Sequence, residues 1–190
     1  ILSNPIKPIF FIDKNIGFVA TLGTYLKTTD GGNSWIEMDL PYDGLAKKVH
    51  NISFVGDSVG WIAASIGGMD GKIFYTTDQG ENWQLISDQV GVVSELDNIN
   101  MDTALVTFYG YGTIPYYGMA GITKNNFTNF SWSSENIDWR KGTFINDTTV
   151  LFYGSNEQKA FKLWTMHIDG GELSEITDFP QTLGYWAAFR

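Results

Sequence analysis

The chain has 190 residues, of which 43% are hydrophobic and 15% aromatic, a composition that argues against disorder. Its 21 acidic and 12 basic residues give a net charge of −9 without any basic stripe, so we exclude nucleic acid and anionic membrane as expected partners. Without cysteine it has no disulfide, thiolate nucleophile or cysteine-based zinc site, and no apolar run is long enough for membrane insertion.

The amino-terminal segment ILSNPIKPIFF lacks an initiator methionine and the layout of a signal peptide, so we expect either a mature form or a piece of a longer chain. The absence of cysteine argues against a eukaryotic extracellular module, whereas a bacterial periplasmic or surface protein can do without disulfides. We therefore expect a secreted, periplasmic or cell-surface protein, bacterial rather than eukaryotic.

In chain order, the first unit begins with an apolar run at residues 8–12, which meets a polar turn and resumes as a β-prone run at 17–20. A third run at 25–28 leads into the octet TTDGGNSW, residues 28–35, and a fourth run follows at 35–38. Tyr, Phe, Ile, Val, Thr and Trp dominate these runs, and no long segment shows helical periodicity. The unit therefore reads as short β-strands joined by turns.

The same order returns in the second unit, where the octet TTDQGENW occupies residues 76–83. Weaker copies of the segment before the octet are INMDTALV at 99–106 and FINDTTVL at 144–151. The octet itself is echoed by TKNNFTNFSW at 123–132 and HIDGGELS at 167–174. A self-similarity that repeats about every 45 residues with four short strands per unit is typical of a β-propeller blade.

We therefore predict an all-β fold, a β-propeller or open propeller arc of about four four-stranded blades in a single domain, residues 1–190. The expected blades cover residues 8–40, 50–88, 96–135 and 142–178. Residues 183–190 are expected to add a strand that closes the ring or starts a further blade.

The chemistry of the octet predicts a structural turn. An aspartate between two β-prone runs can accept hydrogen bonds from backbone N–H groups a few residues ahead, and glycine supplies the positive φ of a tight turn. The tryptophan then begins the next strand with a large ring to pack between sheets. A metal loop is the alternative, but its Asp-x-Asp-x-Asp spacing is absent, and we expect neither metal nor cofactor. The residues assigned to these turns are Thr28, Asp30, Gly32, Trp35, Thr76, Asp78, Gly80, Trp83, Asp169 and Gly171.

The octet pattern S/T-x-D-x-G-x-x-W resembles the Asp-box, or BNR, repeat of sialidases, sortilin-type receptors and the photosystem II stability factor family. The segment from Phe54 through Gly60-Trp61 and Thr76-Thr77-Asp78 to Trp83 looks much like blades of the last group. The resemblance is sharp over residues 9–90 and degraded beyond. It implies that the octet joins the third and fourth strands, away from the ligand face, and that the protein assists assembly by binding another protein.

In an up-and-down sheet, successive turns fall at opposite ends, so the octets share one end with the short turns between first and second strands. The other end collects longer loops, where the function of a scaffold protein usually lies. The segment YGYGTIPYYG at 109–118 is the richest of these, and its tyrosines could stack on sugar rings, anchor a protein, or only pair across a hairpin. The candidate binding face comprises Tyr42, Tyr109, Tyr111, Tyr116, Tyr117, Trp139, Arg140 and Trp186.

Enzyme signatures are weak. Residues 56–60 fit the hydrolase pattern G-x-S-x-G, but that elbow needs a helix after the serine and a strand is predicted here. A sialidase requires three arginines around its substrate carboxylate, and the chain has only Arg140 and Arg190. No pair of carboxylates stands out for glycoside hydrolysis.

We therefore expect a non-enzymatic binding or scaffold protein whose loop-rich face holds a glycan or protein partner. The alternative is a carbohydrate-active enzyme, sialidase-like or another glycoside hydrolase, with part of its site outside this chain; a purely structural spacer is a third reading. The sequence leaves the oligomeric state open.

Overall fold

The computed structural model describes residues 9–20, 24–42, 47–66, 70–109, 118–124, 129–132, 138–155, 161–169 and 173–177. Every regular element within these ranges is a β-strand, and none of these residues forms an apolar helix able to span a bilayer. The strands are β1 (Ile9–Phe11), β2 (Gly17–Ala20), β3 (Tyr25–Thr28), β4 (Ile36–Met38), β5 (Lys47–Val55), β6 (Val59–Ile66), β7 (Asp70–Thr76), β8 (Gln84–Val90), β9 (Val92–Asn98), β10 (Ala104–Tyr109), β11 (Gly118–Lys124), β12 (Asn129–Trp132), β13 (Asp138–Asn146), β14 (Thr149–Ser155), β15 (Phe161–His167) and β16 (Ser174–Glu175).

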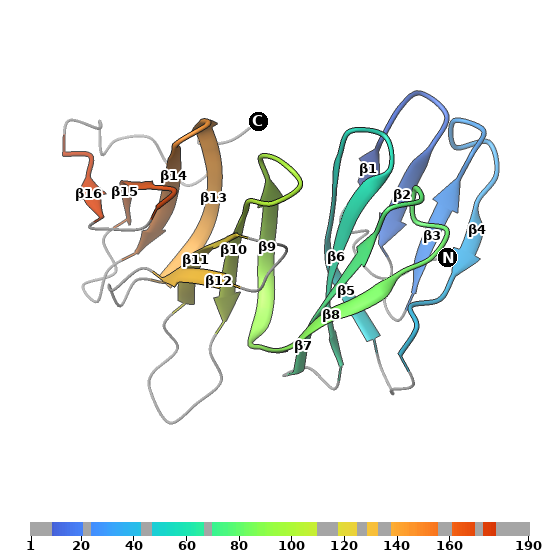
Figure 1. Ribbon diagram of the computed structural model, residues 1–190, viewed down its shortest axis with the longest axis horizontal. Coiled ribbons are helices and arrows are strands. Elements are labelled where there is room, and N and C mark those ends of the chain that lie inside the picture. Colours follow the sequence, from blue (N-terminus) through green and yellow to red (C-terminus); the bar gives the residue numbers. More distant parts are fainter. Residues whose placement is uncertain are drawn as a thin grey trace.

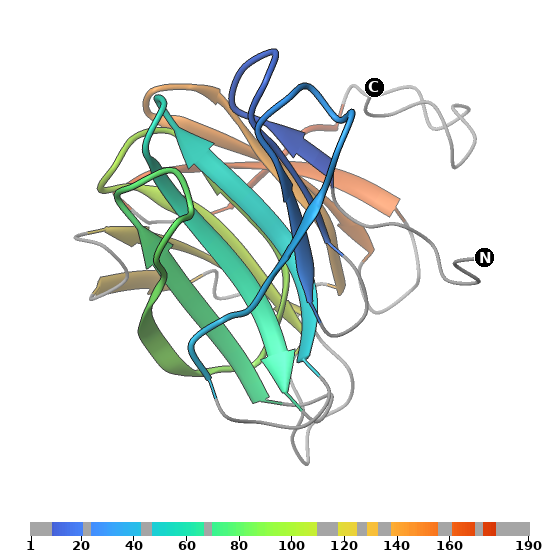
Figure 2. The ribbon, with the colours of Figure 1, turned by 90° about the vertical axis from the view of Figure 1, so that its right-hand side faces the viewer.

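The strands form four antiparallel sheets, each a four-stranded meander in chain order: β1–β4, β5–β8, β9–β12 and β13–β16. The sheets follow one another from right to left in Figure 1 and stack face to face, as the side view in Figure 2 shows. This architecture confirms the predicted all-β fold of about four four-stranded blades.

Three hydrophobic cores hold neighbouring sheets together. The first joins Phe18 and Tyr25 of the first sheet to the second sheet, the next lies between the second and third sheets, and the last lies between the third and fourth. Strand β6 takes part in two of them, because Ile62 faces the first sheet while Trp61 faces the third. Its unbroken apolar run at residues 61–64 is therefore the sequence of a strand buried on both faces.

The first strands of the sheets lie along the inner side of the stack, β5 beside β9 and β9 beside β13. We call them the inner strands. The octets connect β3 to β4 and β7 to β8, and they touch the neighbouring β1–β2 and β5–β6 turns. Gly31 N donates to Asn15 O at 2.9 Å, and Gln79 N donates to Ser58 O at 3.1 Å. This octet end is at the top of Figure 1, and the opposite end is the loop-rich end.

The G-x-S-x-G segment at residues 56–60 lies on the β5–β6 hairpin. Ser58 is in the turn itself, and its carbonyl accepts the hydrogen bond from Gln79 of the second octet. A strand follows the serine, so the strand–turn–helix geometry of a hydrolase elbow does not occur at this position.

Candidate functional site

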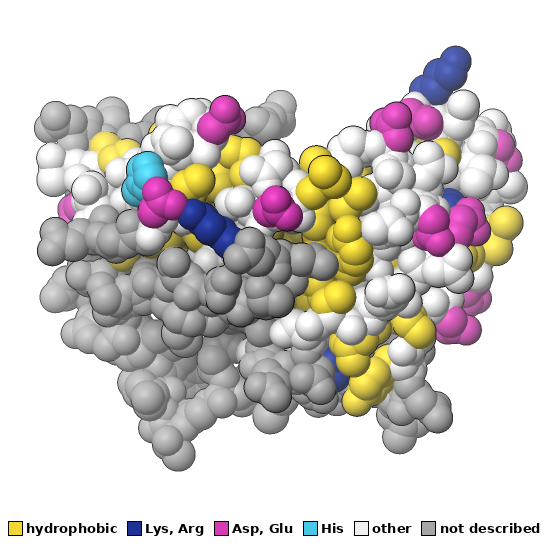
Figure 3. All heavy atoms as spheres, viewed as in Figure 1, with side chains coloured by type: hydrophobic (Ala, Val, Ile, Leu, Met, Phe, Trp, Pro, Cys, Tyr) yellow, Lys and Arg dark blue, Asp and Glu magenta, His cyan; other side chains and the backbone are white. Residues whose placement is uncertain are grey.

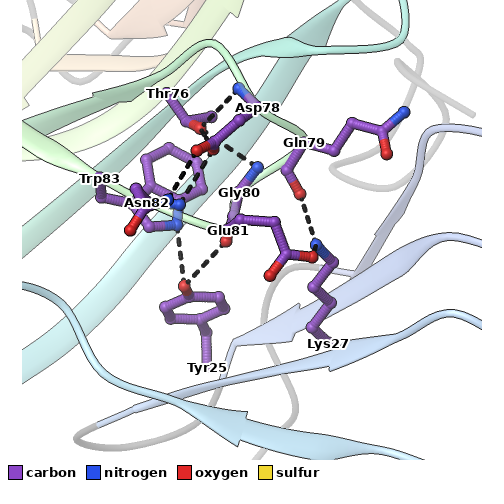
Figure 4. A network of polar contacts seen from close by, with 9 residues as sticks. All are labelled: Tyr25, Lys27, Thr76, Asp78, Gln79, Gly80, Glu81, Asn82 and Trp83. Atoms are coloured by element: carbon purple, nitrogen blue, oxygen red, sulfur yellow. Dashed lines mark hydrogen bonds and ion pairs between the residues drawn. The ribbon is translucent and has the colours of Figure 1, made fainter.

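Both complete octets are closed by hydrogen bonds among their own residues. In the second, Thr76 Oγ1 donates to Asp78 Oδ1 at 2.7 Å and accepts from Gly80 N at 3.2 Å, while Asp78 Oδ1 accepts from Asn82 N at 2.9 Å (Figure 4). Asn82 Nδ2 donates to the second carboxylate oxygen at 2.8 Å. Gly80, the glycine of this octet, has a φ of 73°, a left-handed conformation that favours glycine.

The first octet repeats this pattern. Thr28 Oγ1 donates to Asp30 Oδ1 at 2.8 Å, and Ser34 takes the place of Asn82 by donating its hydroxyl to Asp30 Oδ2 at 2.6 Å. Hydrogen bonds from Ser34 lower the pKa of Asp30 to about 2, and those from Thr76 and then Asn82 lower the pKa of Asp78 to about 2. Because the octets engage both carboxylates so fully, these aspartates are poorly placed to hold a ligand.

The second octet also fastens the first sheet to the second. Trp83 Nε1 donates to the hydroxyl of Tyr25 at 2.8 Å, and the buried Lys27 reaches Gln79 O at 2.8 Å and Glu81 Oε1 at 2.5 Å (Figure 4). Burial raises the pKa of Tyr25. Sequence reasoning did not identify Lys27, because its partners lie more than fifty positions away along the chain.

Asp169 of the fourth sheet does not occupy the position that Asp30 and Asp78 hold in their octets. Val150 pairs with Met166 as Gly17 pairs with Thr28, so Ile168, two residues further on, takes the register position of Asp30. The Asp169 carboxylate instead forms an ion pair with Lys124 of the third sheet, which lowers its pKa. Gly171 lies outside the part of the chain that the structure describes.

Only some residues of the candidate binding face lie within the part of the chain that the structure describes. Tyr42, on the connection between the first two sheets, packs against their shared core, and the Lys72 ammonium lies 5.3 Å from its ring centre. The backbone places Tyr109 at the end of β10, opposite Gly118, and Trp139 and Arg140 in β13 near the loop-rich end. Tyr111, Tyr116, Tyr117 and Trp186 lie outside the described ranges.

A β-bulge recurs in three of the inner strands, β5, β9 and β13, near the loop-rich end. The register of β5 against β6 shifts by one residue between the pairs Val49–Ala64 and Asn51–Ala63, which places a β-bulge at His50. Ser94 in β9 and Arg140 in β13 are left out of the ladder in the same way. Bulges re-aim side chains and often lie beside binding sites.

These bulges occupy one repeat position. His50 and Arg140 stand four residues before Phe54 and Phe144, and Ser94 stands four before Asn98. Phe54, Asn98 and Phe144 have equivalent pairing partners in the second strands of their sheets. The sequence analysis placed Arg140 on the candidate binding face but did not identify His50 or Ser94. One extra residue in a strand does not visibly disturb the apolar pattern, so the sequence gives no sign of the bulge.

His50 is further fixed by its neighbour in the sheet. His50 Nε2 and Ser65 Oγ share a hydrogen bond of 2.8 Å, and Ser65 is buried. This contact positions the imidazole on the side of β5 that faces the third sheet, because Ser65 lies on the same face of β6 as Ala63.

The two ends of the stack differ in charge. Acidic turns dominate the octet end, and Figure 3 shows most of the acidic side chains on this face in its upper part. They include Asp13, Asp30, Asp57, Asp78, Asp102 and Asp147. The loop-rich end is mixed: acids such as Asp70 and Asp138 lie there, but so do Lys48, Lys72, Arg140 and Lys141. Within the described ranges, no three His, Asp or Glu side chains are grouped so that they could hold a metal ion.

Residues 2–92 match the sequence model of the photosynthesis system II assembly factor YCF48 family. A structure of YCF48 bound to a D1 peptide superposes with a TM-score of 0.68 at 18% identity, covering 94% of this chain and 55% of that one. YCF48 from Cyanidioschyzon merolae gives a TM-score of 0.61 at 18% identity, with coverages of 92% and 57%. Comparison with curated protein sequences finds no match.

The fold is therefore that of a BNR-type β-propeller. The part of the chain that contains the first two sheets is similar in sequence to the YCF48 family, whose model matches residues 2–92. The chain spans just over half the length of the YCF48 structures to which it is similar.

Proposed function

We propose that this protein is a non-enzymatic binding or assembly factor that holds an extended segment of a partner protein across its inner strands, at the loop-rich end. The observation that carries this proposal is the recurrence of the bulged residues His50, Ser94 and Arg140 at one repeat position on adjacent strands. One of the similar structures is YCF48 bound to a D1 peptide, which supports a peptide as the ligand.

The spacing of the bulges suits an extended chain. Stacked sheets lie roughly 10 Å apart, while a strand advances about 3.3 Å per residue, so a peptide running across the inner strands would meet a bulge about every third residue. A guanidinium, an imidazole and nearby Lys48 favour carboxylate groups on that peptide. The acidic octet end disfavours the same ligand through like-charge repulsion.

A glycan ligand and a location outside the cytoplasm stay predictions, the first because most of the tyrosines behind it lie outside the described ranges. The carbohydrate-active alternative would need site residues from outside this chain.

The test is binding of a fluorescently labelled D1 peptide, followed by anisotropy, against a matched peptide whose acidic side chains are amidated. We expect Arg140→Ala to weaken binding at least about tenfold and His50→Ala by a smaller factor, since charge-assisted contacts to a guanidinium are the stronger ones. Lys14→Ala, which removes an exposed charge at the octet end, is the matched control and should leave the affinity unchanged.

Binding that is equal for both peptides, or that Lys14→Ala weakens as much as Arg140→Ala, would refute the assignment. Raising the salt concentration from about 50 to about 200 mM should weaken binding of the acidic peptide more than binding of its amidated match, because salt screens exposed charges.

A further inference from the structure

The carboxylate of Asp97 joins two neighbouring inner strands. Asp97 lies in β9, and its Oδ2 accepts a hydrogen bond from the Thr143 hydroxyl of β13 at 3.1 Å and another from Phe144 N at 3.4 Å. Strands β9 and β13 lie side by side but belong to different sheets (Figure 1). One side chain therefore fastens the inner strand of the fourth sheet to that of the third, and we call these two hydrogen bonds the Asp97 clamp.

The backbone contact of the clamp satisfies part of an open strand edge. β13 is the first strand of its sheet, so it pairs with β14 along one edge only. N–H groups along the other edge need acceptors from elsewhere. Phe144 N–H is directed at Asp97, and an ionised carboxylate is a stronger acceptor than a neutral group. The clamp thus holds the backbone of β13 as well as one of its side chains.

The clamp occupies the same repeat position on both strands, shortly after a bulge. Asp97 lies three residues after Ser94 in β9, and Thr143 lies three residues after Arg140 in β13. A strand advances about 3.3 Å per residue, so the clamp is about 10 Å from each bulge along its strand. A contact that keeps Asp97 beside Thr143 therefore also keeps the two bulges in register.

Packing alone does not require a charged residue at this position. The four inner strands carry Phe10, Ser53, Asp97 and Thr143 there, as their pairing with the second strands shows. Asp97 is half-buried, which costs free energy for a carboxylate unless hydrogen bonds compensate it. Its negative charge also disfavours an acidic peptide nearby. A carboxylate at this place is therefore best explained by the two hydrogen bonds that it accepts.

We propose that Asp97 is a positioning residue of the candidate binding site, which holds the bulges at Ser94 and Arg140 at the spacing that one extended peptide needs. The inference rests on the proposed function, since it assumes that the peptide crosses β9 and β13. Asp97 acts through the backbone of β13 and need not touch the peptide. Binding groups must be held within about 0.5 Å of their productive geometry, so a loosened β13 lowers the contribution of Arg140.

The test is binding of the labelled D1 peptide, measured by anisotropy, to the 190-residue chain and its variants. Asp97→Ala should weaken binding about threefold to tenfold, and no more than Arg140→Ala does, because the clamp acts through that contact. The sign is informative, since removal of a negative charge by itself strengthens binding of an acidic peptide. Asp97→Asn keeps an acceptor oxygen and should recover most of the lost affinity.

Two threonines of the β13–β14 hairpin provide a matched pair of variants. Thr143→Val removes the hydroxyl of the clamp at nearly the same side-chain size and should weaken binding, as Asp97→Ala does. Thr148→Val is the control, because its hydroxyl donates to Asn146 Oδ1 in the exposed turn at the octet end. This control should leave the affinity unchanged. Circular dichroism establishes that each variant is folded.

Double variants separate positioning from a general loss of structure. In an Arg140→Ala background, the further change Asp97→Ala should have little effect on affinity, because the contact that Asp97 positions is already gone. In a His50→Ala background, the same change should keep its full effect, since His50 lies on β5, outside the clamp. Equal losses in the two backgrounds would overturn the positioning role.

The clamp also has a readout that needs no peptide. The Phe144 amide proton should exchange with solvent faster in Asp97→Ala than in the unsubstituted chain, and Asp97→Asn should slow it again. Unchanged exchange would refute the clamp. Unchanged peptide binding in Asp97→Ala, together with a clear loss in Arg140→Ala, would overturn the role of Asp97 alone. Unchanged binding in Arg140→Ala would refute the proposed function, and the role of Asp97 with it.

Discussion

The first and second sheets contain nearly the same aromatic cluster, yet one cluster is a core and the other is a surface. Phe54 and Trp83 are covered by the rings of the preceding sheet, whereas Phe11 remains 41% exposed. The contribution of a residue in this fold therefore depends on the neighbouring sheet as much as on its own repeat position. Paired substitutions at equivalent positions can measure that dependence.

The largest difference is expected for the phenylalanines. Phe54→Ala should lower the free energy of unfolding by about 3–5 kcal/mol, because it empties a packed site between two sheets. Phe11→Ala removes a ring that is already partly in water and should cost no more than about 1.5 kcal/mol. Urea denaturation of the two variants at one protein concentration measures both values, and equal losses would contradict the comparison.

The glycines should show a smaller difference of the same sign. Gly60→Ala would bring a methyl group within 2.4 Å of the Phe54 ring, which Phe18 and Trp83 hold in place, so we expect a loss of about 2–3 kcal/mol. In Gly17→Ala the exposed Phe11 ring can swing away, and the loss should stay near about 1 kcal/mol. Thermal unfolding followed by circular dichroism would reveal the ranking, and the reverse order would be inconsistent with the packing.

Removing the hydroxyl of Tyr25 tests the polar contact between the first and second sheets. Tyr25→Phe leaves the indole N–H of the buried Trp83 without its acceptor and should cost about 1–2 kcal/mol. The indole resonance of Trp83 should shift in a proton–nitrogen spectrum. The resonance of Trp35, which donates to its own octet, should stay in place and serves as the internal control. Movement of both resonances would mean that the two sheets are coupled more widely than this contact.

The smallest expected effect is on acid stability. The pKa values of Asp30 and Asp78 are lowered from 3.8 to about 2 in the folded protein, so each contributes stability above about pH 4 that is lost as the pH falls toward 2. Asp30→Asn and Asp78→Asn should each flatten the decline of the unfolding midpoint over this range, by similar amounts. Urea midpoints measured at several pH values provide the test, and an unchanged slope in both variants would refute it.

Much of the fold was readable from the sequence because its repeat combines two strong local signals. Period-two apolar runs predict strands, and the Asp–Gly spacing of the octets predicts the turn that the structure places between β3 and β4 and between β7 and β8. The exposed cluster around Phe11 and the buried cluster around Phe54 could not be told apart from the sequence. The two phenylalanines lie in similar segments and differ in which sheet lies next to them.

The candidate site was harder to predict for a related reason. A β-bulge adds one residue to a strand, and the spacings of 44 positions from His50 to Ser94 and of 46 positions from Ser94 to Arg140 look like ordinary variation in repeat length. The place of Asp169 was obscured because the pairing in the fourth sheet differs from the alignment of the octets in the sequence. Val150 pairs with Met166 as Gly60 pairs with Thr76, so Met166 rather than His167 takes the place of the octet threonine. The binding role of the tyrosines at 109–117 stays a prediction.

The self-contained octet has a consequence for how such a protein can lengthen over evolutionary time. Each complete octet satisfies its threonine and aspartate within eight residues, and the second and third sheets each have one face packed on the preceding sheet and the other on the following sheet. A tandem duplication of one unit thus inherits a finished turn together with both surfaces needed to join the row. We therefore expect whole sheets to be the unit by which such a protein lengthens or shortens, while the packing between neighbouring sheets is kept.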